Sequence, residues 1–286
     1  MPWSSPDSLL DGAVELASPP VIYQRLVEVI EDPRSHAGDL AGVISDDPAL
    51  ATRVLKIVNS AFFGFPRRVE SISQAVTVIG MTQIRDLALA TSVMALFENV
   101  SEDLVDVQSF WIHSLACGAG TRSIAVRRGE ANAERFFIAG LIHDIGRLVM
   151  YVRAGEEMGR VVQLAHESDS AVWKAEREVF GFDHGQVGRA LCRRWRLPPS
   201  CQEAVGLHHV PHNARQFPVE TAAVHIADVV ANAMRWGTSG EPRVPGFEKA
   251  AWDALGLEVE TTSSLVQDIH QNLAGLSGLL PGKKAA

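Results

Sequence analysis

One stretch of the chain constrains its fold more than any other: residues 136–150 are apolar almost throughout, yet they contain His143 and Asp144. A helix that is apolar on every side must lie inside the protein. A buried imidazole and a buried carboxylate are costly unless they are paired, hydrogen-bonded or bound to a metal. We therefore expect a central helix, over residues 133–152, with a polar site in its middle.

Isolated ionisable residues interrupt other apolar helical segments in the same way. His113 follows three large apolar residues, Asp228 is the only charge in residues 224–231, and a His-His pair closes a helix before Pro211. Imidazole and carboxylate ligands together favour Fe, Mn, Zn, Co or Ni over Mg or Ca. We therefore predict a site for one or two divalent transition-metal ions. The candidate ligands are His113, His143, Asp144, His184, His208, His209 and Asp228.

Each of these positions also has a structural interpretation. His143 and Asp144 could form a buried ion pair or a hydrogen bond between helices, because buried charges require some partner. His208 and His209 could instead meet the free carbonyl groups at a helix C-terminus. His225, one turn before Asp228, either supports the site or fills the core.

The hydrophobic pattern predicts an all-α fold, since helical spacing dominates and no alternating strand pattern is evident. Asp47 and Pro48 form a helix start, Ser71 and Gln74 have capping-box spacing, and Gly80 breaks the following run. A short helix is expected near residues 9–16. From the middle of the chain onward, helices are expected at residues 109–128, 133–152, 156–168, 170–180, 184–195, 199–209, 217–236, 248–255 and 262–276.

The chain divides into four parts by composition. Residues 1–18 form a loosely attached lead segment that ends at a Pro-Pro pair, and the polar residues 98–106 mark the best internal boundary. We therefore expect an N-terminal helical half at 19–105, a metal-site half at 106–236, and C-terminal helices with a tail at 237–286.

Charge and cysteine content exclude several protein classes. The net charge of -8 makes binding of nucleic acid or of an anionic membrane unfavourable. Three cysteines without a CxxC pair do not suggest a disulfide framework, and they fit a reducing cytosol. With no signal peptide and no uninterrupted apolar span, the sequence predicts a cytoplasmic protein without membrane contact.

The candidate ligands occur in the order H … HD … H … HH … D, which resembles the pattern of the HD superfamily of metal-dependent phosphohydrolases. Over residues 19–232 the chain also resembles the HDOD (HD-related output domain) family. The segments that carry this second resemblance are residues 44–50, 58–64, 71–76, 79–80, 140–147, 180–184, 187–188, 195–198 and 208–211.

The resemblance implies an HD-domain-like bundle of helices with an N-terminal helical subdomain packed on it. It also implies how the ligands divide: His113, His143, Asp144 and Asp228 would hold one ion, and Asp144 shared with His184, His208 and His209 would hold a second. Such metals activate water for attack on a phosphoester, since they lower its pKa to about 7. Asp144 and Arg147 would then be catalytic, with Arg147 clamping a phosphate, although Arg147 could equally be a structural partner of an aspartate.

Two departures argue against hydrolysis of cyclic di-GMP. Arg147 stands where the related HD-GYP phosphodiesterases have lysine, and no Gly-Tyr-Pro motif follows His209. The first functional hypothesis is therefore a regulatory module of bacterial signal transduction that depends on a signalling partner, since no receiver, kinase or cyclase segment is attached. The alternative is a metal-dependent phosphohydrolase acting on a nucleotide or other phosphoester, and a third possibility is a scaffold with an empty site.

Overall fold

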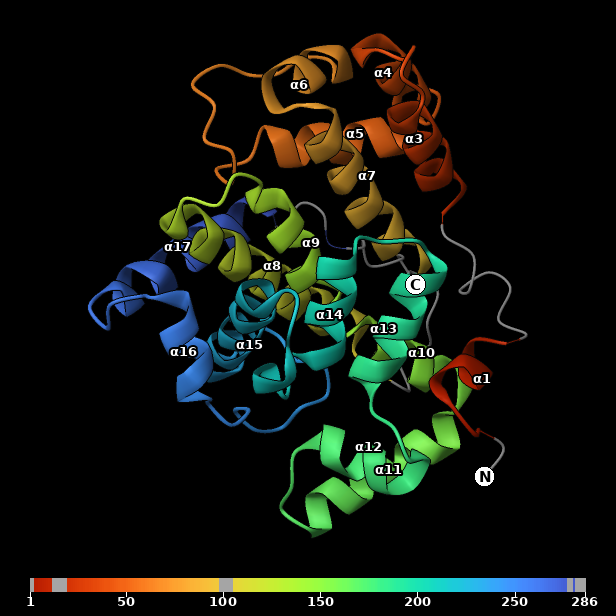
Figure 1. Cartoon of the computed structure of the whole chain (residues 1–286), viewed down its shortest axis with the longest axis vertical. Coiled ribbons are helices and arrows are strands. Elements are labelled where there is room, and N and C mark those ends of the chain that lie inside the picture. The colour runs from red at the N-terminus through yellow and green to blue at the C-terminus, as the bar shows by residue number, and fades with distance from the viewer. Residues whose placement is uncertain (1–2, 12–19, 98–104, 277–279, 281–286) are drawn as a thin grey trace, which may run out of the picture.

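The structure is a computed structural model that describes residues 3–11, 20–97, 105–276 and 280 (Figure 1). This described part is all-helical and contains no strand, which confirms the predicted fold class. The first helices are α1 (Pro6–Leu10), α3 (Val21–Glu31), α4 (Ala37–Ser45), α5 (Pro48–Val58), α6 (Ile72–Ile79) and α7 (Met81–Leu96). The rest are α8 (Val107–Arg128), α9 (Ala133–Ile142), α10 (Ile145–Arg153), α11 (Gly155–Glu167), α12 (Val172–Phe180), α13 (His184–Arg194), α14 (Pro199–Leu207), the short 3-10 helix η1 (Pro211–Asn213), α15 (Pro218–Ala233), α16 (Lys249–Leu255) and α17 (Thr261–Leu276).

Helices α3 to α7 form the N-terminal bundle at the top of Figure 1. As predicted, Asp47 caps α5 by accepting hydrogen bonds from the backbone N–H groups of Ala49 and Leu50. Gly80 separates α6 from α7 with a φ of 106°, a conformation that costs a glycine little. The long helix α7 leaves the bundle and packs on α9, which joins the bundle to the rest of the molecule.

Arg122 of α8 strengthens this junction. Its guanidinium donates to the carbonyl of Phe62 at 3.0 Å and lies 4.2 Å from the centre of the Phe62 ring. The same side chain pairs with Glu134 at 3.3 Å. The corner after α5 is therefore fixed to the central helix by a hydrogen bond, a cation–π contact and an ion pair.

The central body is built around α8, which packs against α9, α15 and α17. Beside it, α10 packs on α13, and α13 packs on α14. A Cβ atom at Gly146 would overlap the carbonyl oxygen of His184, so α10 and α13 touch backbone to backbone there. This close approach brings the residues at the start of α10 next to those at the start of α13.

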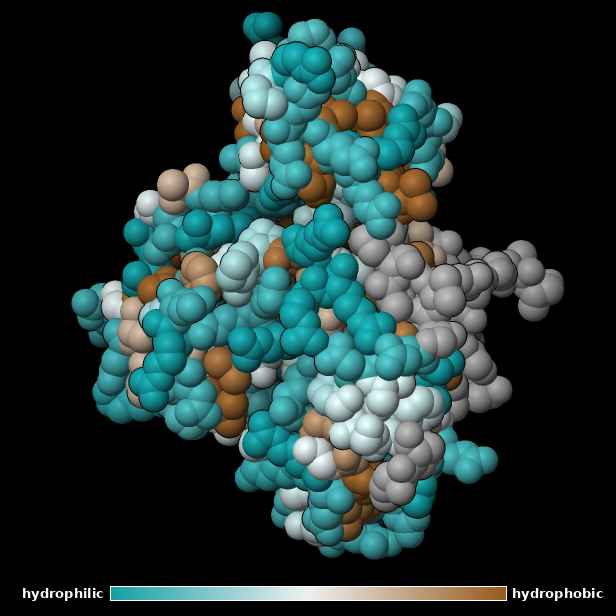
Figure 2. Space-filling model, turned by 45° about the vertical axis from the view of Figure 1, so that its right-hand side comes forward, coloured by the Kyte–Doolittle hydropathy of each residue, from teal (hydrophilic) through white to brown (hydrophobic). Residues whose placement is uncertain are grey.

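The surface is mostly polar on the face shown in Figure 2, where hydrophobic residues gather only in separate small patches. Exposed large apolar side chains such as Val21, Phe247 and Val259 come from distant parts of the sequence. Within the described ranges, none of the helices combines the length and apolar composition that a bilayer crossing requires.

The expected single helix over residues 133–152 is wrong. The chain forms α9 and α10 instead, and His143 and Asp144 occupy the break between them. Asp144, with φ -96° and ψ 7°, leaves the helical conformation, and α10 starts again at the next residue. The two residues therefore sit at a helix junction, where their side chains can face a site that neither helix alone would reach.

The expectation of a loosely attached lead segment is also wrong for residues 3–11. Leu9 and Leu10 are both 0% exposed, and such burial stabilises by about 1.5–3 kcal/mol per leucine side chain. Asp7 pairs with Arg193 at 2.7 Å. Helix α1 (Pro6–Leu10) overlaps the first residues of the predicted helix at 9–16. Residues 12–16 of that prediction, most of the predicted boundary at 98–106 and the tail at 281–286 lie outside the described residues.

Candidate metal centre

All seven predicted ligands come together inside the central body. Among the described residues, two groups of side chains have ligand atoms within 4.8 Å of one another. The α8 cluster consists of His113, Cys117, His143 and Asp228, and the α13–α14 cluster consists of Asp144, His184, His208 and His209. Each cluster draws on at least two helices or helix junctions that are distant in sequence.

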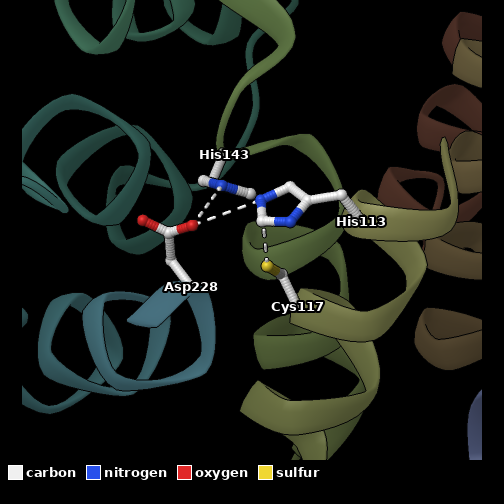
Figure 3. Close-up of side chains that lie close together, drawn as sticks. All are labelled: His113, Cys117, His143 and Asp228. Atoms are coloured by element: carbon white, nitrogen blue, oxygen red, sulfur yellow. Dashed lines mark hydrogen bonds and ion pairs between the residues drawn. The ribbon is translucent and has the colours of Figure 1, made fainter. Parts of the chain in front are cut away.

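All four side chains of the α8 cluster are buried. Figure 3 shows them lying close together. Nε2 of His113 lies 3.2 Å from Oδ1 of Asp228 and 3.5 Å from Sγ of Cys117. Nε2 of His143 lies 3.7 Å from the same aspartate oxygen. The donors come from α8, from the residue after α9, and from α15, so the packing of these three elements fixes their relative positions.

The α13–α14 cluster is formed by three imidazoles around one carboxylate. Nε2 of His184 lies 2.9 Å from Nε2 of His209, 3.4 Å from Nε2 of His208 and 2.9 Å from Oδ1 of Asp144. His209 is only half-buried, and its ring stacks on Trp173 with ring centres 5.5 Å apart. This cluster therefore reaches towards the surface, unlike the α8 cluster.

Asp144 connects the two clusters, because its two oxygens face in different directions. Oδ2 lies 3.3 Å from Nε2 of His143 and 3.9 Å from Nε2 of His113. Oδ1 faces the other side, towards His184 and, at 3.5 Å, His208. A carboxylate in this position can offer one oxygen to an ion in each cluster.

Hydrogen bonds orient the imidazoles so that Nε2 faces the clusters. Nδ1 of His143 donates to the Gly140 carbonyl and Nδ1 of His208 to the Val205 carbonyl, each at 2.8 Å. Nδ1 of His184 donates to Oε2 of Glu176 at 2.6 Å. Protein metal sites commonly use such partners to fix the ring and the nitrogen available to a metal.

His225 also supports the site. Its Nδ1 donates to the carbonyl of His208 at 2.8 Å, and its Nε2 accepts the backbone N–H of Glu248 at 3.1 Å. This arrangement uses both ring nitrogens and fixes the backbone that carries the His-His pair. Of the two roles expected for His225, support of the site or filling of the core, these contacts favour support of the site.

In the metal-free site, the electrostatics favour protonated histidines beside ionised carboxylates. Burial opposes the charged form of His143, but Asp144 and Asp228 outweigh it and raise the pKa of His143 to about 10. Burial and Arg147 oppose protonation of His184, yet Glu176 and Asp144 raise its pKa to about 9. Burial would raise the pKa of Asp144, but the surrounding cationic groups hold it well below its usual value.

Arg147 is engaged in structural contacts. The side chain is 1% exposed, and its Nε donates to Oε1 of Glu176 at 3.3 Å. One terminal nitrogen donates to the hydroxyl of Ser239 at 2.8 Å, and the other lies 3.0 Å from Nδ1 of His184. The arginine partners a carboxylate, as one expectation held, but that carboxylate is chiefly Glu176, with Asp144 at 3.8 Å. A phosphate could reach the guanidinium only if these contacts were replaced.

The donor geometry fits a bound cation. Nitrogen ligands at 2.0–2.1 Å around a tetrahedral zinc would lie about 3.3 Å apart, close to the 2.9 and 3.4 Å separations in the α13–α14 cluster. Nε2 of His143 and Oδ1 of Asp144 are buried and have no hydrogen-bond partner among the described residues. Because buried polar atoms are normally satisfied, these two atoms point to an additional ligand between them.

Sequence reasoning missed two residues of this site. Cys117 was grouped with the apolar residues of its helix, although its position four residues after His113 places both on one helix face. Glu176 was not singled out at all. It lies on the apolar stripe of α12 with Val172 and Phe180, and one acid on such a stripe is the same signal that identified Asp228.

Comparisons with known proteins identify the family of this chain. Residues 16–211 match the family described as HDOD domain. An uncharacterized protein of Treponema pallidum (strain Nichols) is 26% identical over 215 residues, which cover 73% of this chain but 41% of that protein. The chain therefore spans about two fifths of the length of this relative.

Solved structures share the fold over nearly the whole chain. An HDOD domain protein of unknown function from Geobacter sulfurreducens has a TM-score of 0.75 and 25% identity, covering 91% of this chain and 92% of that chain. A Shewanella amazonensis SB2B protein provisionally named a phosphohydrolase has a TM-score of 0.74 and 22% identity, covering 95% and 97%. A Marinobacter aquaeolei VT8 protein provisionally named a signal transduction protein has a TM-score of 0.71 and 20% identity, covering 96% and 61%. The fold, the paired His/Asp clusters and the match over most of its length show that this chain belongs to the HDOD family.

Proposed function

We propose that this chain is a regulatory protein of bacterial signal transduction that holds one or two divalent transition-metal ions. The α8 cluster would hold one ion and the α13–α14 cluster the other, with Asp144 shared between them. The protein ligands would include His113, His143, Asp144, His184, His208, His209 and Asp228. We expect the protein to act in the cytoplasm through a signalling partner, without binding nucleic acid.

The observation that carries the metal assignment is the orientation of Asp144. Its two oxygens face separate groups of imidazoles, and one of them, Oδ1, is buried without a hydrogen bond among the described residues. Without a metal, these carboxylates and protonated imidazoles must be held as buried ion pairs in a region that water does not reach, which carries a large desolvation cost. A bound metal would supply the positive charge that satisfies these donors and a centre able to polarise a ligand oxygen.

The enclosure of the site supports a regulatory role. Of the predicted ligands only His209 is more than marginally exposed, so a substrate has little access to the centre. Arg147, the residue expected to clamp a phosphate, donates instead to Glu176 and Ser239. The Marinobacter protein provisionally named a signal transduction protein shares this fold.

A metal-dependent phosphohydrolase acting on a nucleotide or other phosphoester is the alternative. The complete set of seven donors favours it, because a purely structural site does not need two adjoining groups of ligands. Two Shewanella amazonensis proteins with this fold carry provisional names as phosphohydrolases, one of them metal-dependent. In this case Arg147 would have to exchange Glu176 or Ser239 for the substrate.

Elemental analysis of protein purified without chelator tests the metal assignment. We expect at least one equivalent of a transition metal per chain, and loss of that metal in Asp144→Asn. Asp253→Asn is the matched control, since Asp253 is exposed on α16 and pairs only with Lys249. Protein that carries no stoichiometric metal, even after refolding with zinc, manganese or iron, would contradict the proposal.

A second measurement separates the two functions. Metal-loaded protein is assayed for turnover of nucleotides, cyclic nucleotides and an aryl phosphodiester. In parallel, a bacterial strain from which the gene has been deleted is complemented with the wild-type gene or with Asp144→Asn. The regulatory proposal predicts no turnover but a signalling defect that only wild type restores. Turnover that Asp144→Asn abolishes would instead establish the phosphohydrolase.

A further inference from the structure

Cys117 lies inside the α8 cluster, where the expected ligand set contains no sulfur (Figure 3). It follows His113 by four residues on α8, so both side chains project from the same helix face. The residue is 0% exposed, and its sulfur lies 3.5 Å from Nε2 of His113. The side chain therefore borders the same space as the predicted ligands His113, His143 and Asp228.

Three distances within this group match the separations of ligands around one metal ion. With a metal–sulfur bond of 2.3 Å and a metal–nitrogen bond of 2.0–2.1 Å, the two ligand atoms would lie about 3.6 Å apart, and the observed distance is 3.5 Å. A nitrogen and an oxygen ligand would be about 3.4 Å apart, and Asp228 lies 3.2 Å from His113 and 3.7 Å from His143. These three pairs thus have the separations of ligands on one ion, and all four ligand atoms lie within 4.8 Å of one another.

An independent observation indicates that a ligand belongs in this space. Nε2 of His143 is buried and faces the cluster, and it makes no hydrogen bond among the described residues, its nearest oxygens being those of Asp144 at 3.3 Å and Asp228 at 3.7 Å. A hydrogen bond between Cys117 and His113 would account for the position of the sulfur, but it would leave this nitrogen unsatisfied. A cation among the four side chains satisfies both.

We propose that Cys117 is a protein ligand of the ion in the α8 cluster, where it adds a thiolate to His113, His143, Asp228 and the shared Asp144. The inference rests on the proposed metal centre and names the chemistry of one ion in it. On binding, the metal replaces the thiol proton, which passes to solvent, and the thiolate binds the metal through sulfur. No oxidant or reductant is required.

A thiolate changes which metal this cluster prefers. Sulfur ligands favour zinc and other softer ions, whereas carboxylates and water suit manganese and magnesium. The α8 cluster should therefore select zinc, with cobalt as a close substitute. The α13–α14 cluster contains no cysteine and should tolerate a wider range of ions, including manganese and iron.

Cobalt loading tests the inference with a spectroscopic readout. A cobalt–thiolate bond gives a near-ultraviolet charge-transfer band that imidazole and carboxylate ligands do not produce. The chain has three cysteines, so the experiment uses Cys192→Ser/Cys201→Ser, in which Cys117 is the only thiol. Adding Cys117→Ser to this background retains the size of the side chain and its ability to hydrogen-bond His113.

The inference predicts a charge-transfer band in the double variant and its loss on adding Cys117→Ser. Zinc affinity at this cluster should fall by more than the roughly 10–100-fold that follows loss of a supporting hydrogen bond to a metal ligand. If the double variant does not fold, X-ray absorption at the zinc edge compares the zinc-loaded wild type with Cys117→Ser. The inference then predicts a sulfur neighbour at about 2.3 Å from zinc in the wild type that is absent in Cys117→Ser.

The remaining outcomes separate this inference from the proposed function. Cobalt that binds stoichiometrically without a sulfur band, or with a band that survives Cys117→Ser, would exclude Cys117 as a ligand and leave the metal centre intact. Failure of cobalt, zinc and manganese to bind at all would overturn both the metal centre and the role of Cys117.

Discussion

The α8 cluster and the α13–α14 cluster share Asp144 but differ in composition and enclosure. The first combines two imidazoles, a carboxylate and a thiol, and all four side chains are buried. The second has three imidazoles and a carboxylate, and its His209 is half-buried against Trp173. The α13–α14 cluster also has its own anionic support from Glu176. A sealed, sulfur-containing cluster suits permanent metal retention, whereas a partly open, histidine-rich cluster suits exchange with solvent.

The largest effect is expected from Asp144→Asn, which breaks both clusters together. Replacing the carboxylate removes one of the anions that balance the protonated His143 and His184 in the interior, and breaking a buried pair in this way typically costs about 3–5 kcal/mol. We expect this loss in the free energy of unfolding of chelated protein, measured by denaturant titration, together with loss of both metals. Asp253→Asn should change stability by less than about 0.5 kcal/mol. Retention of a full metal complement would show that Asp144 does not connect the clusters.

Proton release should distinguish the two clusters. In metal-free protein the pKa of His143 is about 10 and that of His184 about 9, so at pH 7 both carry a proton that a metal must displace. Burial, Asp228 and Asp144 also raise the pKa of the Cys117 thiol well above its usual value. Metal affinity should therefore rise by about tenfold per pH unit for each proton released, up to about pH 9 at the α13–α14 cluster and to pH 10 or above at the α8 cluster.

The α8 cluster should then release about two protons per ion, from His143 and Cys117, and the α13–α14 cluster about one, from His184. Calorimetric titrations in buffers of different ionisation enthalpy count these protons directly. Cys117→Ser should lower the total by about one. A pH-independent affinity between pH 6 and 8 would contradict the proton displacement on which this comparison depends.

Glu176→Gln should weaken one cluster and spare the other. Glu176 accepts the Nδ1–H and the backbone N–H of His184, at 2.6 and 2.8 Å. Losing such a partner typically lowers metal affinity 10–100-fold, so we expect this loss at the α13–α14 cluster in competitive chelator titrations. Glu178→Gln, an exposed neighbour on the same helix, is the control. Equal weakening of both clusters would mean that they do not act as separate sites.

Trp173→Ala should have the smallest effect. The indole stacks on the half-buried His209, and such aromatic contacts contribute about 0.5–1.5 kcal/mol. Without it, His209 gains freedom, and metal should leave the α13–α14 cluster a few-fold faster in stopped-flow chelation, with no change at the α8 cluster. Trp252→Ala removes a tryptophan of α16 whose ring lies beside Phe247 rather than beside a predicted ligand, and it should leave both rates unchanged.

Much of the fold follows from the hydrophobic period, but the break at His143 and Asp144 does not. Residues on both sides of the break are buried, so the pattern continues without interruption while the backbone leaves the helix. Periodicity records which faces are buried, and it cannot detect a helix that ends inside the core. The attachment of α1 was missed for a related reason, since it depends on partners such as Arg193 that are distant in sequence.

The site was predictable to the extent that its residues stood out from their neighbours. A histidine or aspartate in an apolar helix is conspicuous, and all seven candidates converge in the structure. Cys117 is itself hydrophobic, so nothing in its immediate surroundings distinguishes it from a core residue. The sequence could not decide whether Arg147 faces a substrate or a carboxylate. Its partner Glu176 lies on another helix, α12, and only the folded structure shows that the two side chains meet.

Arg122 gives α8 a mechanical role that extends beyond the metal clusters. The helix carries His113 near its start and Arg122 nine residues later, about 14 Å along the same rod. Arg122 holds the Phe62 corner by a hydrogen bond and by its position over the ring. Because α8 is one continuous helix between these residues, a tilt of the helix at His113 also moves the Phe62 corner. We therefore expect the buried polar residues of the α8 cluster and the C-terminal end of α5 to move together.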